Sequence, residues 1–525
     1  MCAMDESRGV SNIDTPTVLS NQVVVLEAAA FHQESLKPRE EDKEEPRYKP
    51  FRGIFRRVPV NEVAEELIRL GKLSFPLAIT TLFMHSKSII SMMYLGRMGK
   101  AELAGGALAI SFANITGFSI IKGLCMGMDP ICCQAYGAKR WSLVSQTYIK
   151  TVLLLLLTTI PIVLLWLNVE HLFKHLGQDR AITKIAKLYL IFSLPDLIAH
   201  SNLHPLRSFL RTQGLTSPAT IVSTIATILH FPITYSLSTY FNLGVKGIAL
   251  ASVSHTYNMN IGLIIYIFAS KVSIKPWVGA TFISTFQGWR PLLSLAIPSV
   301  CSVCLEWWWY EIILFLSGLM SNPESSVAAM GILIQTTGTI YVFPYALSLA
   351  TSQRVGYELG AGQPARARWA AVVGVSVGLT LGCSIFGLTI ALRSVWGKMY
   401  TNEPQILDLI KTALPLLGLA EIGNAPQTTA SGALTGSARP KIGIRINLAA
   451  FYLIGLPAVV VLSFKMKIGF QGLWIGLVLS QAACLIMMVY TLIKTDWKHQ
   501  AKRAEELTVA AGQGHDEDTG TNLVP

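Results

Sequence analysis

Charged residues are scarce in this chain. Asp, Glu, Lys and Arg make up 14% of its 525 residues, against 51% hydrophobic residues, and the mean hydropathy is +0.47. That balance excludes an ordinary soluble domain and is typical of a polytopic membrane protein. The formal net charge is +12, but the basic residues flank apolar segments, so they indicate orientation in a bilayer rather than binding to nucleic acid.

Several kinds of functional motif are missing as well. Seven of the eight cysteines lie in or beside apolar segments, with no metal-ligand or disulfide spacing. The chain has no metal triad, phosphate-binding Walker loop or GxSxG nucleophile elbow. Residues Gln22 to Phe31 are apolar but follow an acidic start, so we expect no signal peptide. These absences predict a protein that is not an enzyme and uses no cofactor or metal.

Long apolar segments recur along the chain and predict an all-α polytopic membrane protein with twelve transmembrane helices. A membrane helix needs about 20 mostly apolar residues. The expected spans are residues 72–96, 103–128, 143–167, 181–203, 216–240, 247–269, 291–319, 327–350, 369–392, 405–433, 441–462 and 469–492.

These spans divide into two lobes of six helices, flanked by polar tails. The expected parts are a disordered N-terminal tail (1–64), an N-lobe (65–275), a linker (276–290), a C-lobe (291–495) and a C-terminal tail (496–525). An even number of spans puts both tails on one side of the membrane. The loops on that side are basic, for example YGAKRW and GAGQPARAR, which favours cytosolic termini.

An internal repeat supports the two lobes. KLSFP, ending at Pro76, matches SLAIP, ending at Pro298, and RTQGLTSP, ending at Pro218, matches GALTGSARP, ending at Pro440; the spacing is 222 residues in both pairs. Because each copy holds six spans, both copies enter the bilayer from the same face. Parallel repeats of this kind are related by an axis along the membrane normal, and the substrate path is expected between them.

One carboxylate stands out inside an apolar segment. The run from Ser294 to Leu319 is long enough to span a bilayer, and Glu306 falls near its middle, about 18 Å into the span at about 1.5 Å per residue. A charged carboxylate at that depth is energetically costly, so such residues usually have a function. Glu306 is therefore a candidate for a group that takes up and releases protons during transport. The alternative is a structural ion pair within a helix bundle. Pro298 offers a place for the helix to bend.

Three motifs carry a resemblance to a known family. QAYGA at Gln134 to Ala138, ELGAG at Glu358 to Gly362 and ASGALTGSARPKIG from Ala430 resemble signatures of the multidrug and toxic compound extrusion (MATE) family. CLEWWWYE and GMDPICCQAYGA resemble its plant detoxification branch in particular. The resemblance covers about residues 65 to 495 and leaves out both tails.

The resemblance implies a secondary transporter whose two six-helix lobes form a V-shaped cavity. Plant members resemble proton-coupled exporters of organic compounds, and their seventh-span glutamate corresponds to Glu306. Many relatives also carry an acidic residue in the tenth span, three positions before a glutamine. Here the glutamine is Gln427 and the position holds Asn424, so Glu421 becomes the second candidate for proton coupling.

Other polar groups within the spans are candidates for the same path. Lys87 is expected either to hold an anionic substrate or to form a structural pair with Glu306. Asp129 either shares in proton coupling as a gate at the cytosolic mouth or is an exposed acid at a helix end. Asn114, on the same span, is a candidate substrate-binding residue with similar support. Asp196, His200 and His204 form a candidate proton relay, in which His200 could also bind substrate; the alternative is ordinary hydrogen-bonded histidines.

Aromatic residues next to Glu306 are expected to bind substrate. Trp307, Trp308 and Trp309 cannot all face one cavity, because consecutive helical residues point about 100° apart. We expect Trp307 and Trp309 to contact substrate, together with Tyr310 and Tyr341. The polar side chains of Asn424 and Gln427 on the tenth span are expected to bind substrate as well. The glycines of YGA and LGAG are expected to form tight inner loops.

The sequence therefore predicts a proton-coupled antiporter that exports a small organic solute, such as a metabolite, an organic-acid hormone or a xenobiotic. Two alternatives are a membrane signalling or scaffold protein on the same fold and a lipid flippase. We expect a monomer in the plasma membrane, with a vacuolar or post-Golgi membrane as the alternative. Lys87 and Lys122 within the membrane favour an anionic or zwitterionic substrate without deciding it.

Overall fold

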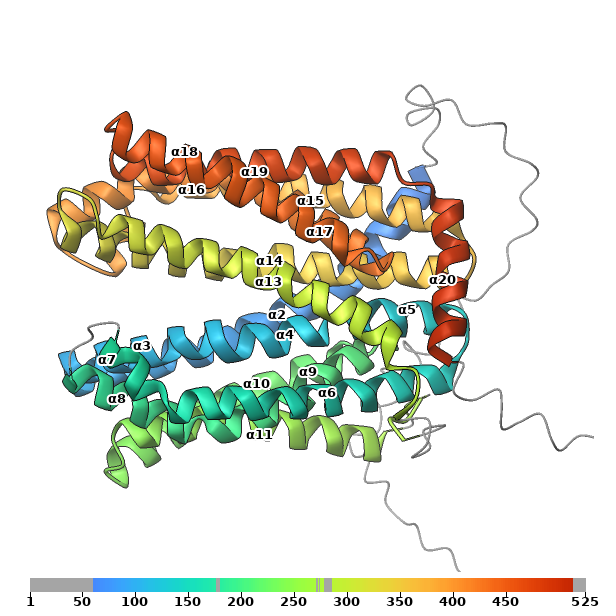
Figure 1. The fold of residues 1–525 in the computed structure, drawn as a ribbon, viewed down its shortest axis with the longest axis horizontal. Coiled ribbons are helices and arrows are strands. Elements are labelled where there is room, and N and C mark those ends of the chain that lie inside the picture. Colours follow the sequence, from blue (N-terminus) through green and yellow to red (C-terminus); the bar gives the residue numbers. More distant parts are fainter. Residues whose placement is uncertain (1–59, 176–179, 271, 273, 278–285, 513–525) are drawn as a thin grey trace, which may run out of the picture. The chain divides into compact units, whose positions relative to one another are not determined.

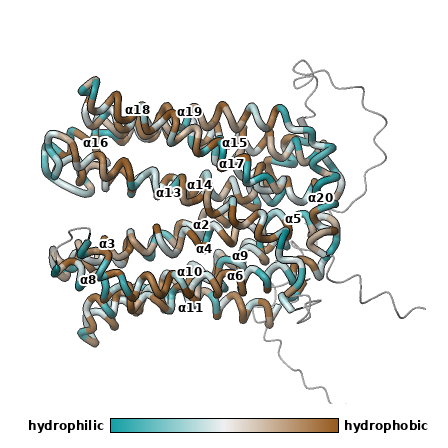
Figure 2. The backbone as a smooth tube through the Cα atoms, viewed as in Figure 1, coloured by the Kyte–Doolittle hydropathy of each residue, from teal (hydrophilic) through white to brown (hydrophobic). Residues whose placement is uncertain are grey.

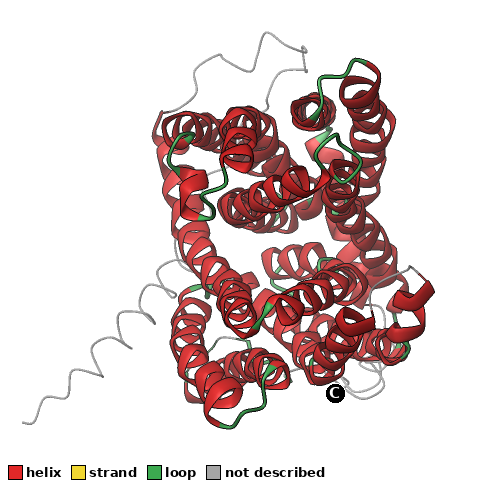
Figure 3. Cartoon of the chain, turned by 90° about the vertical axis from the view of Figure 1, so that its left-hand side faces the viewer, coloured by secondary structure: helices red, strands yellow, loops and turns green. Residues whose placement is uncertain are grey.

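The computed structural model describes residues 60–175, 180–270, 272, 274–277 and 286–512. Every helix described below belongs to one compact unit. The predicted N-terminal tail lies outside the described residues, apart from the start of the first helix. All secondary structure in the described part of the chain is helical, as the sequence predicts (Figure 3).

The N-lobe comprises the helices between residues 60 and 269, and Figure 1 draws them from blue to green. In chain order they are α2 (Val60–Met98), α3 (Lys100–Ala113), the π-helix η1 (Asn114–Phe118), α4 (Ser119–Cys125), α5 (Met128–Gly137), α6 (Trp141–Leu167), α7 (Val169–His175), α8 (Arg180–Phe192), α9 (Leu194–Thr212), α10 (Ser217–Tyr235), the π-helix η2 (Ser236–Tyr240) and α11 (Val245–Ala269).

The C-lobe comprises the helices between residues 289 and 493. They are α13 (Trp289–Ser317), α14 (Pro323–Gly360), α15 (Pro364–Leu392), the 3-10 helix η3 (Trp396–Met399), α16 (Pro404–Gly436), α17 (Pro440–Asn447), the π-helix η4 (Leu448–Gly455), α18 (Leu456–Val460), the π-helix η5 (Val461–Lys465) and α19 (Phe470–Ile493). Four of these helices, α14 to α17, begin with proline, whose fixed φ suits a first helical turn and whose missing N–H costs nothing there.

The helices suit a bilayer along most of their length. Nine helical segments of the described chain are long and apolar enough to cross a membrane by composition alone. The predicted spans 181–203, 247–269 and 405–433 are not among these nine; they correspond to helices α8 and α9, α11 and α16, which hold most of the buried polar clusters described below. Large apolar side chains face outward, among them Leu157, Ile160 and Ile486, and hydrophilic residues gather toward the helix ends (Figure 2). Outward apolar faces are stable only against lipid.

The backbone repeats itself in the two lobes. After the fifth span, Asn242 and Gly244 have φ values of 51° and 57°, and after the eleventh, Lys467 and Gly469 have 56° and 70°. In both lobes this turn follows a π-helical turn, η2 or η5. The internal repeat found in the sequence is thus also a repeat of local structure.

The two lobes meet through several helix pairs, α2 with α14 and α4 with α13 among them, and α5 meets α14 at the end of the helices that carries QAYGA and ELGAG (Figure 1). We call this contact the inter-lobe seal. Gln134 Nε2 donates to the Gly436 carbonyl at 2.9 Å, and the Tyr357 hydroxyl donates to the Thr212 carbonyl at 2.8 Å. Both bonds cross from one lobe to the other, so the seal depends on polar groups as well as on packing.

Glycines allow the two backbones of the seal to approach closely. A Cβ at Gly137 would collide with the Tyr357 carbonyl oxygen, and a Cβ at Gly360 would collide with the Gln134 carbonyl oxygen. Each glycine is the last residue of its helix, α5 or α14. The prediction of tight loops holds for Gly362, whose φ of 71° lies in the short connection after α14, whereas Gly137 and Gly360 instead let the lobes touch.

The C-terminal tail also differs from the prediction, because residues Trp497–Gly512 form a helix, α20. Trp497 and Ala504 are buried in a small apolar cluster with α14 and α15 of the C-lobe. Ala511, at the other end, is buried in the N-lobe core. Helix α20 thus crosses both lobes at the end of the inter-lobe seal (Figure 1).

Candidate functional site

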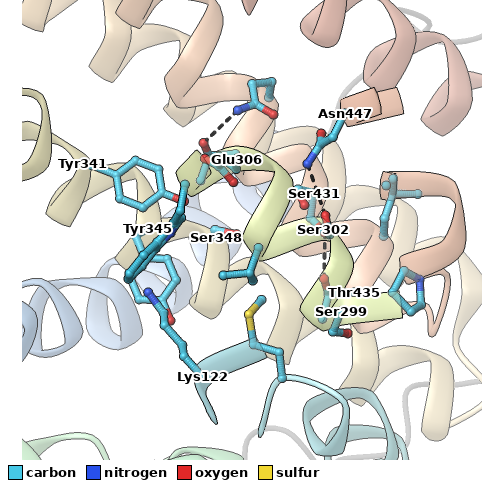
Figure 4. Close-up of a pocket in the computed structure, with 18 residues that line it drawn as sticks. Lys122, Ser299, Ser302, Glu306, Tyr341, Tyr345, Ser348, Ser431, Thr435 and Asn447 are labelled. Atoms are coloured by element: carbon cyan, nitrogen blue, oxygen red, sulfur yellow. Dashed lines mark hydrogen bonds between the residues drawn. The ribbon is translucent and has the colours of Figure 1, made fainter. Parts of the chain in front are cut away.

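A pocket between the lobes contains Glu306, and we call it the Glu306 pocket. It lies between α4 of the N-lobe and α13, α14, α16 and α17 of the C-lobe (Figure 4). Helices α4 and α13 come close because α4 carries glycine where they touch: a Cβ at Gly123 would lie 2.7 Å from the Val300 Cα. Small residues let membrane helices approach in this way. The pocket is thus built at the crossing of the second and seventh spans.

Glu306 is half-buried and faces Tyr341 and Lys122. The Tyr341 hydroxyl is its hydrogen-bond partner, and Lys122 is the cation whose charge acts on it. No basic group of the described chain lies within 4.0 Å of the carboxylate. The structural ion pair considered as the alternative role is therefore absent from the described residues, and Glu306 borders a space that water and solutes can occupy.

Lys122 reaches the same pocket from the N-lobe. Its ammonium lies 4.1 Å from the centre of the Tyr345 ring and 5.1 Å from that of Trp307. A cation over aromatic faces is stabilised by the ring quadrupole, by about 2 kcal/mol or more where water is excluded. Lys122 is thus held by rings of the C-lobe rather than by a carboxylate, and its charge stays available to Glu306 and to a ligand.

The three consecutive tryptophans separate as helix geometry requires. Trp307 lines the pocket, Trp308 is 45% exposed on the outer surface, and Trp309 is fully buried in the C-lobe core. The Trp309 ring lies 5.5 Å from that of Phe451. The prediction that Trp309 contacts substrate is wrong for this arrangement, because its indole packs into the core, away from the pocket.

Glu421 lies deeper in the C-lobe and is 2% exposed. Asn424 Nδ2 donates to both of its carboxylate oxygens, at 3.0 and 3.1 Å. Like Glu306, it has no ion-pair partner within the described residues. Tyr310 lies in the electrostatic field of both glutamates and hydrogen-bonds with Gln481. The sequence placed the two acids on separate spans, and the structure brings them into one polar region.

Hydrogen bonds connect Glu421 to the helix of Glu306. Gln427 Nε2 donates to Asn424 Oδ1 at 3.2 Å, and the Cys484 Sγ lies 3.3 Å from Gln427 Oε1 and 3.6 Å from Asn447 Oδ1, so its one thiol proton is within reach of both acceptors. Asn447 Nδ2 then donates to Ser302 Oγ at 3.1 Å, one turn before Glu306 on α13 (Figure 4). A connected set of donors and acceptors thus joins the tenth, eleventh, twelfth and seventh spans.

Lys87 belongs to a different cluster, inside the N-lobe. Its ammonium donates to Asp196 Oδ2 and to Thr256 Oγ1, both at 3.3 Å. His200 Nε2 lies 3.7 Å from the same Asp196 oxygen, and His200 Nδ1 lies 3.2 Å from His204 Nε2. The predicted pair of Lys87 with Glu306 is replaced by a pair with Asp196, and a substrate role for Lys87 or His200 stays a prediction.

Asp129 is 3% exposed, so it is not the exposed helix-end acid considered from the sequence. Arg211 Nη2 lies 2.6 Å from its Oδ1, and the Ser208 hydroxyl donates to the same oxygen. Asn114 is half-buried at the start of η1 and lines neither of the pockets described here. The second span therefore contributes Lys122, rather than Asn114, to the Glu306 pocket.

Sequence reasoning missed Arg207, which lines a second pocket together with Asp129 and Lys122. The predicted fourth span ended at residue 203, so Arg207 fell outside it, whereas α9 continues to Thr212. The signal was present in the spacing of His204, Arg207 and Arg211, which share one helix face at intervals of three and four residues.

Comparisons with known proteins agree with this architecture. The MatE family model matches residues 76–236 and 298–461, one match in each lobe. Protein DETOXIFICATION 53 of Arabidopsis thaliana is 56% identical over 458 residues, which cover 87% of this chain and 94% of that protein. Protein DETOXIFICATION 49 of the same plant is 48% identical, with 87% and 91% covered.

A solved structure is similar over the same region. The crystal structure of the eukaryotic MATE transporter AtDTX14 has a TM-score of 0.81 and 30% identity, and the match covers 85% of this chain and all of that one. The predicted fold of twelve transmembrane helices in two lobes is confirmed, as is the predicted family. The chain therefore belongs to the MATE family and is a multi-pass membrane protein of the efflux-transporter class.

Proposed function

We propose that this protein is a proton-coupled antiporter that exports a small organic solute by alternating access, and that Glu306 binds the coupled proton. The observation that carries the proposal is the position of Glu306: it borders a pocket between the lobes, and no basic group of the described residues lies within 4.0 Å of it. A carboxylate without a fixed counter-charge in an apolar helix either takes up a proton or finds water.

The position of Lys122 links that proton to lobe movement. Lys122 comes from the N-lobe, whereas Glu306 and Tyr341 belong to the C-lobe. When the lobes rock, the distance between Lys122 and Glu306 changes, and the proton affinity of Glu306 changes with it. A ligand whose affinity differs between two conformations shifts their populations, and a proton acts by the same rule.

Glu421 is the second carboxylate in this proposal. Glu421 and Glu306 both act electrostatically on Tyr310, and the carboxylate of Glu421 accepts hydrogen bonds from the Asn424 amide rather than from a cation. Asp129 fits the coupling role less well, because Arg211 holds it in an ion pair. We therefore assign coupling to Glu306 and Glu421 and a structural role to Asp129.

Orientation and location complete the proposal. With the basic loops in the cytosol, the inter-lobe seal closes the cytosolic end, and the Glu306 pocket is reached from the other side. Each pH unit of gradient supplies about 1.36 kcal/mol, and each 100 mV about 2.3 kcal/mol per charge moved. At the plasma membrane both forces would favour proton entry, so the proton gradient can drive export without a cofactor. In this proposal the protein acts as a monomer.

The test is flux in proteoliposomes with an imposed pH gradient. Two radiolabelled probes, tetraethylammonium and salicylate, cover an organic cation and an organic anion. We expect proton-driven flux of at least one probe in the native protein and loss of that flux in Glu306→Gln. Glu311→Gln is the matched control, since Glu311 lies on the same helix, is half-buried and does not line the pocket.

Three outcomes would contradict the proposal. Near-normal gradient-driven flux in Glu306→Gln would remove the carboxylate from the mechanism. An absence of flux for both probes in correctly folded, reconstituted protein would favour the scaffold alternative. Movement of a fluorescent phospholipid between leaflets, without flux of either probe, would favour the flippase.

A further inference from the structure

A second pocket lies beside the first and is basic; we call it the basic pocket. Helices α2, α4, α5, α9, α10 and α14 line it, and it shares Lys122, Met126 and Tyr345 with the Glu306 pocket. The two pockets therefore border the same side chains. The function proposed above uses Glu306 and leaves the basic pocket without a role.

Cations exceed carboxylates in the basic pocket. Its basic side chains are Lys122, Arg207 and Arg211, and its one carboxylate is Asp129. Arg211 already holds that carboxylate at 2.6 Å. No acidic group of the described chain lies within 4.0 Å of Lys122 or Arg207. Two positive charges are thus left without an ion-pair partner there.

Arg207 shows most directly that the basic pocket lacks enough negative charge to balance its cations. Its Nε is buried and has no hydrogen-bond partner within the described residues. A buried donor without an acceptor is unfavourable, whereas a charge-assisted bond to an anion is about twice as strong as a neutral one. The planar guanidinium also matches a carboxylate in shape, because two N–H groups meet two oxygens. The position of this donor therefore favours an anionic ligand.

Beside the polar side chains of His204, Ser208 and Thr216, the pocket has apolar and aromatic walls. Leu77, Leu215 and Leu349 line it together with the Tyr345 ring, over which Lys122 lies at 4.1 Å. A ligand with a hydrocarbon body would gain about 25 cal/mol of binding free energy per Å² of apolar surface that it buries against these walls. A small inorganic anion would leave these walls unused. The combination favours an organic anion with an apolar or aromatic body.

Resting on the function proposed above, we infer that the transported solute is a small organic carboxylate whose charge is bound by Arg207 and Lys122 in the basic pocket. Lys122 borders both pockets, so it connects the substrate to the surroundings of Glu306. Exchange of such a monoanion for one proton moves two elementary charges in the same sense, whereas exchange of a monocation for a proton moves none. The membrane potential therefore drives the first exchange and leaves the second unaffected.

Equilibrium binding in detergent micelles tests the inference independently of transport. The probe is radiolabelled salicylate, with tetraethylammonium and inorganic phosphate as competitors. We expect salicylate to bind the native protein, and Arg207→Gln to weaken binding at least about tenfold, the value of one hydrogen bond to a charged group. Arg207→Lys should lose part of that affinity, because it keeps the charge without the planar fork. The matched control Lys184→Gln removes a positive charge from an exposed site in the same lobe and should bind normally.

Thermal unfolding measurements show whether a loss of binding in Arg207→Gln comes from the site or from unfolding. Because Arg207 Nε has no partner in the described protein, Arg207→Gln should unfold no earlier than the native chain without ligand, and salicylate should raise the unfolding temperature of the native protein alone. Equal binding by Arg207→Gln, or phosphate competing as well as salicylate, would overturn the assignment. Proton-driven flux of tetraethylammonium without salicylate binding would also overturn it while leaving the proposed function intact. Salicylate binding without proton-driven flux of either probe would contradict the proposed function and not this site.

Discussion

Alanine in place of Gly360 should open the inter-lobe seal. A Cβ at this position collides with the Gln134 carbonyl oxygen and lies 2.8 Å from the Gln134 Cα, well inside an ordinary contact. Both are backbone atoms, so no side chain can move aside and helices α5 and α14 must separate. Overpacking of this kind costs about 1–3 kcal/mol. The helix-forming preference of alanine is the same in both conformations and cancels.

That cost converts directly into a change of population. Since about 1.4 kcal/mol is a factor of ten, the conformation with the seal open should become about 5 to 140 times more populated relative to the closed one. Cys133 is a natural reporter, because it is 2% exposed and lies against Gly356 in the seal. Its thiol should therefore react with a reagent only when α5 and α14 have parted.

The assay is labelling by a membrane-impermeant maleimide, with the modified cysteine identified by mass spectrometry. Labelling of Cys133 should accelerate in Gly360→Ala by the same factor, provided that opening is fast compared with modification. Gly331→Ala is the matched control, because Gly331 lies on the same helix and a Cβ there meets nothing within 4 Å. If Cys133 reacts at the same rate in Gly360→Ala as in the native protein, the seal does not depend on the glycine contact.

Two further predictions concern stability. Arg354 is 1% exposed and bonded to both Glu66 and Glu358, so Arg354→Gln should lose about 3–5 kcal/mol by leaving two buried carboxylates uncompensated; a thermal shift no larger than that of the exposed control Arg368→Gln would contradict this. Trp309→Ala should lose about 3–5 kcal/mol of folding free energy. Trp307→Ala should lose less and instead weaken salicylate binding indirectly, because the Trp307 ring lies 5.1 Å from the Lys122 ammonium and helps to position it. The opposite order in unfolding and binding experiments would show that the two rings have been assigned wrongly.

The sequence predicted the architecture well because apolar length and an internal repeat are properties of the chain itself. The two family matches begin at Pro76 and Pro298, the residues that end the first repeated pair. The depth of Glu306 and the separation of three consecutive tryptophans followed from the rise and rotation of an α-helix. The sequence could not tell which tryptophan faces the core, because the helix is apolar all round.

Side-chain partners were harder to predict. The sequence allowed a pair of Lys87 with Glu306, but a position within a span does not fix the direction of a side chain, and Lys87 turns into its own lobe toward Asp196. Arg207 was missed because helix α9 continues to Thr212, nine residues beyond the predicted end of its span at residue 203. Helix α20 was missed because its burial depends on contacts with both lobes, which no local composition reveals.

Direct observation of the proton on Glu306 tests the central claim most closely. Infrared difference spectra of the reconstituted protein, recorded as the pH is lowered, should contain a protonated-carboxyl band that disappears in Glu306→Gln and persists in the matched control Glu311→Gln. Loss of that band should accompany loss of gradient-driven flux. A band and a flux that both survive in Glu306→Gln would contradict the account.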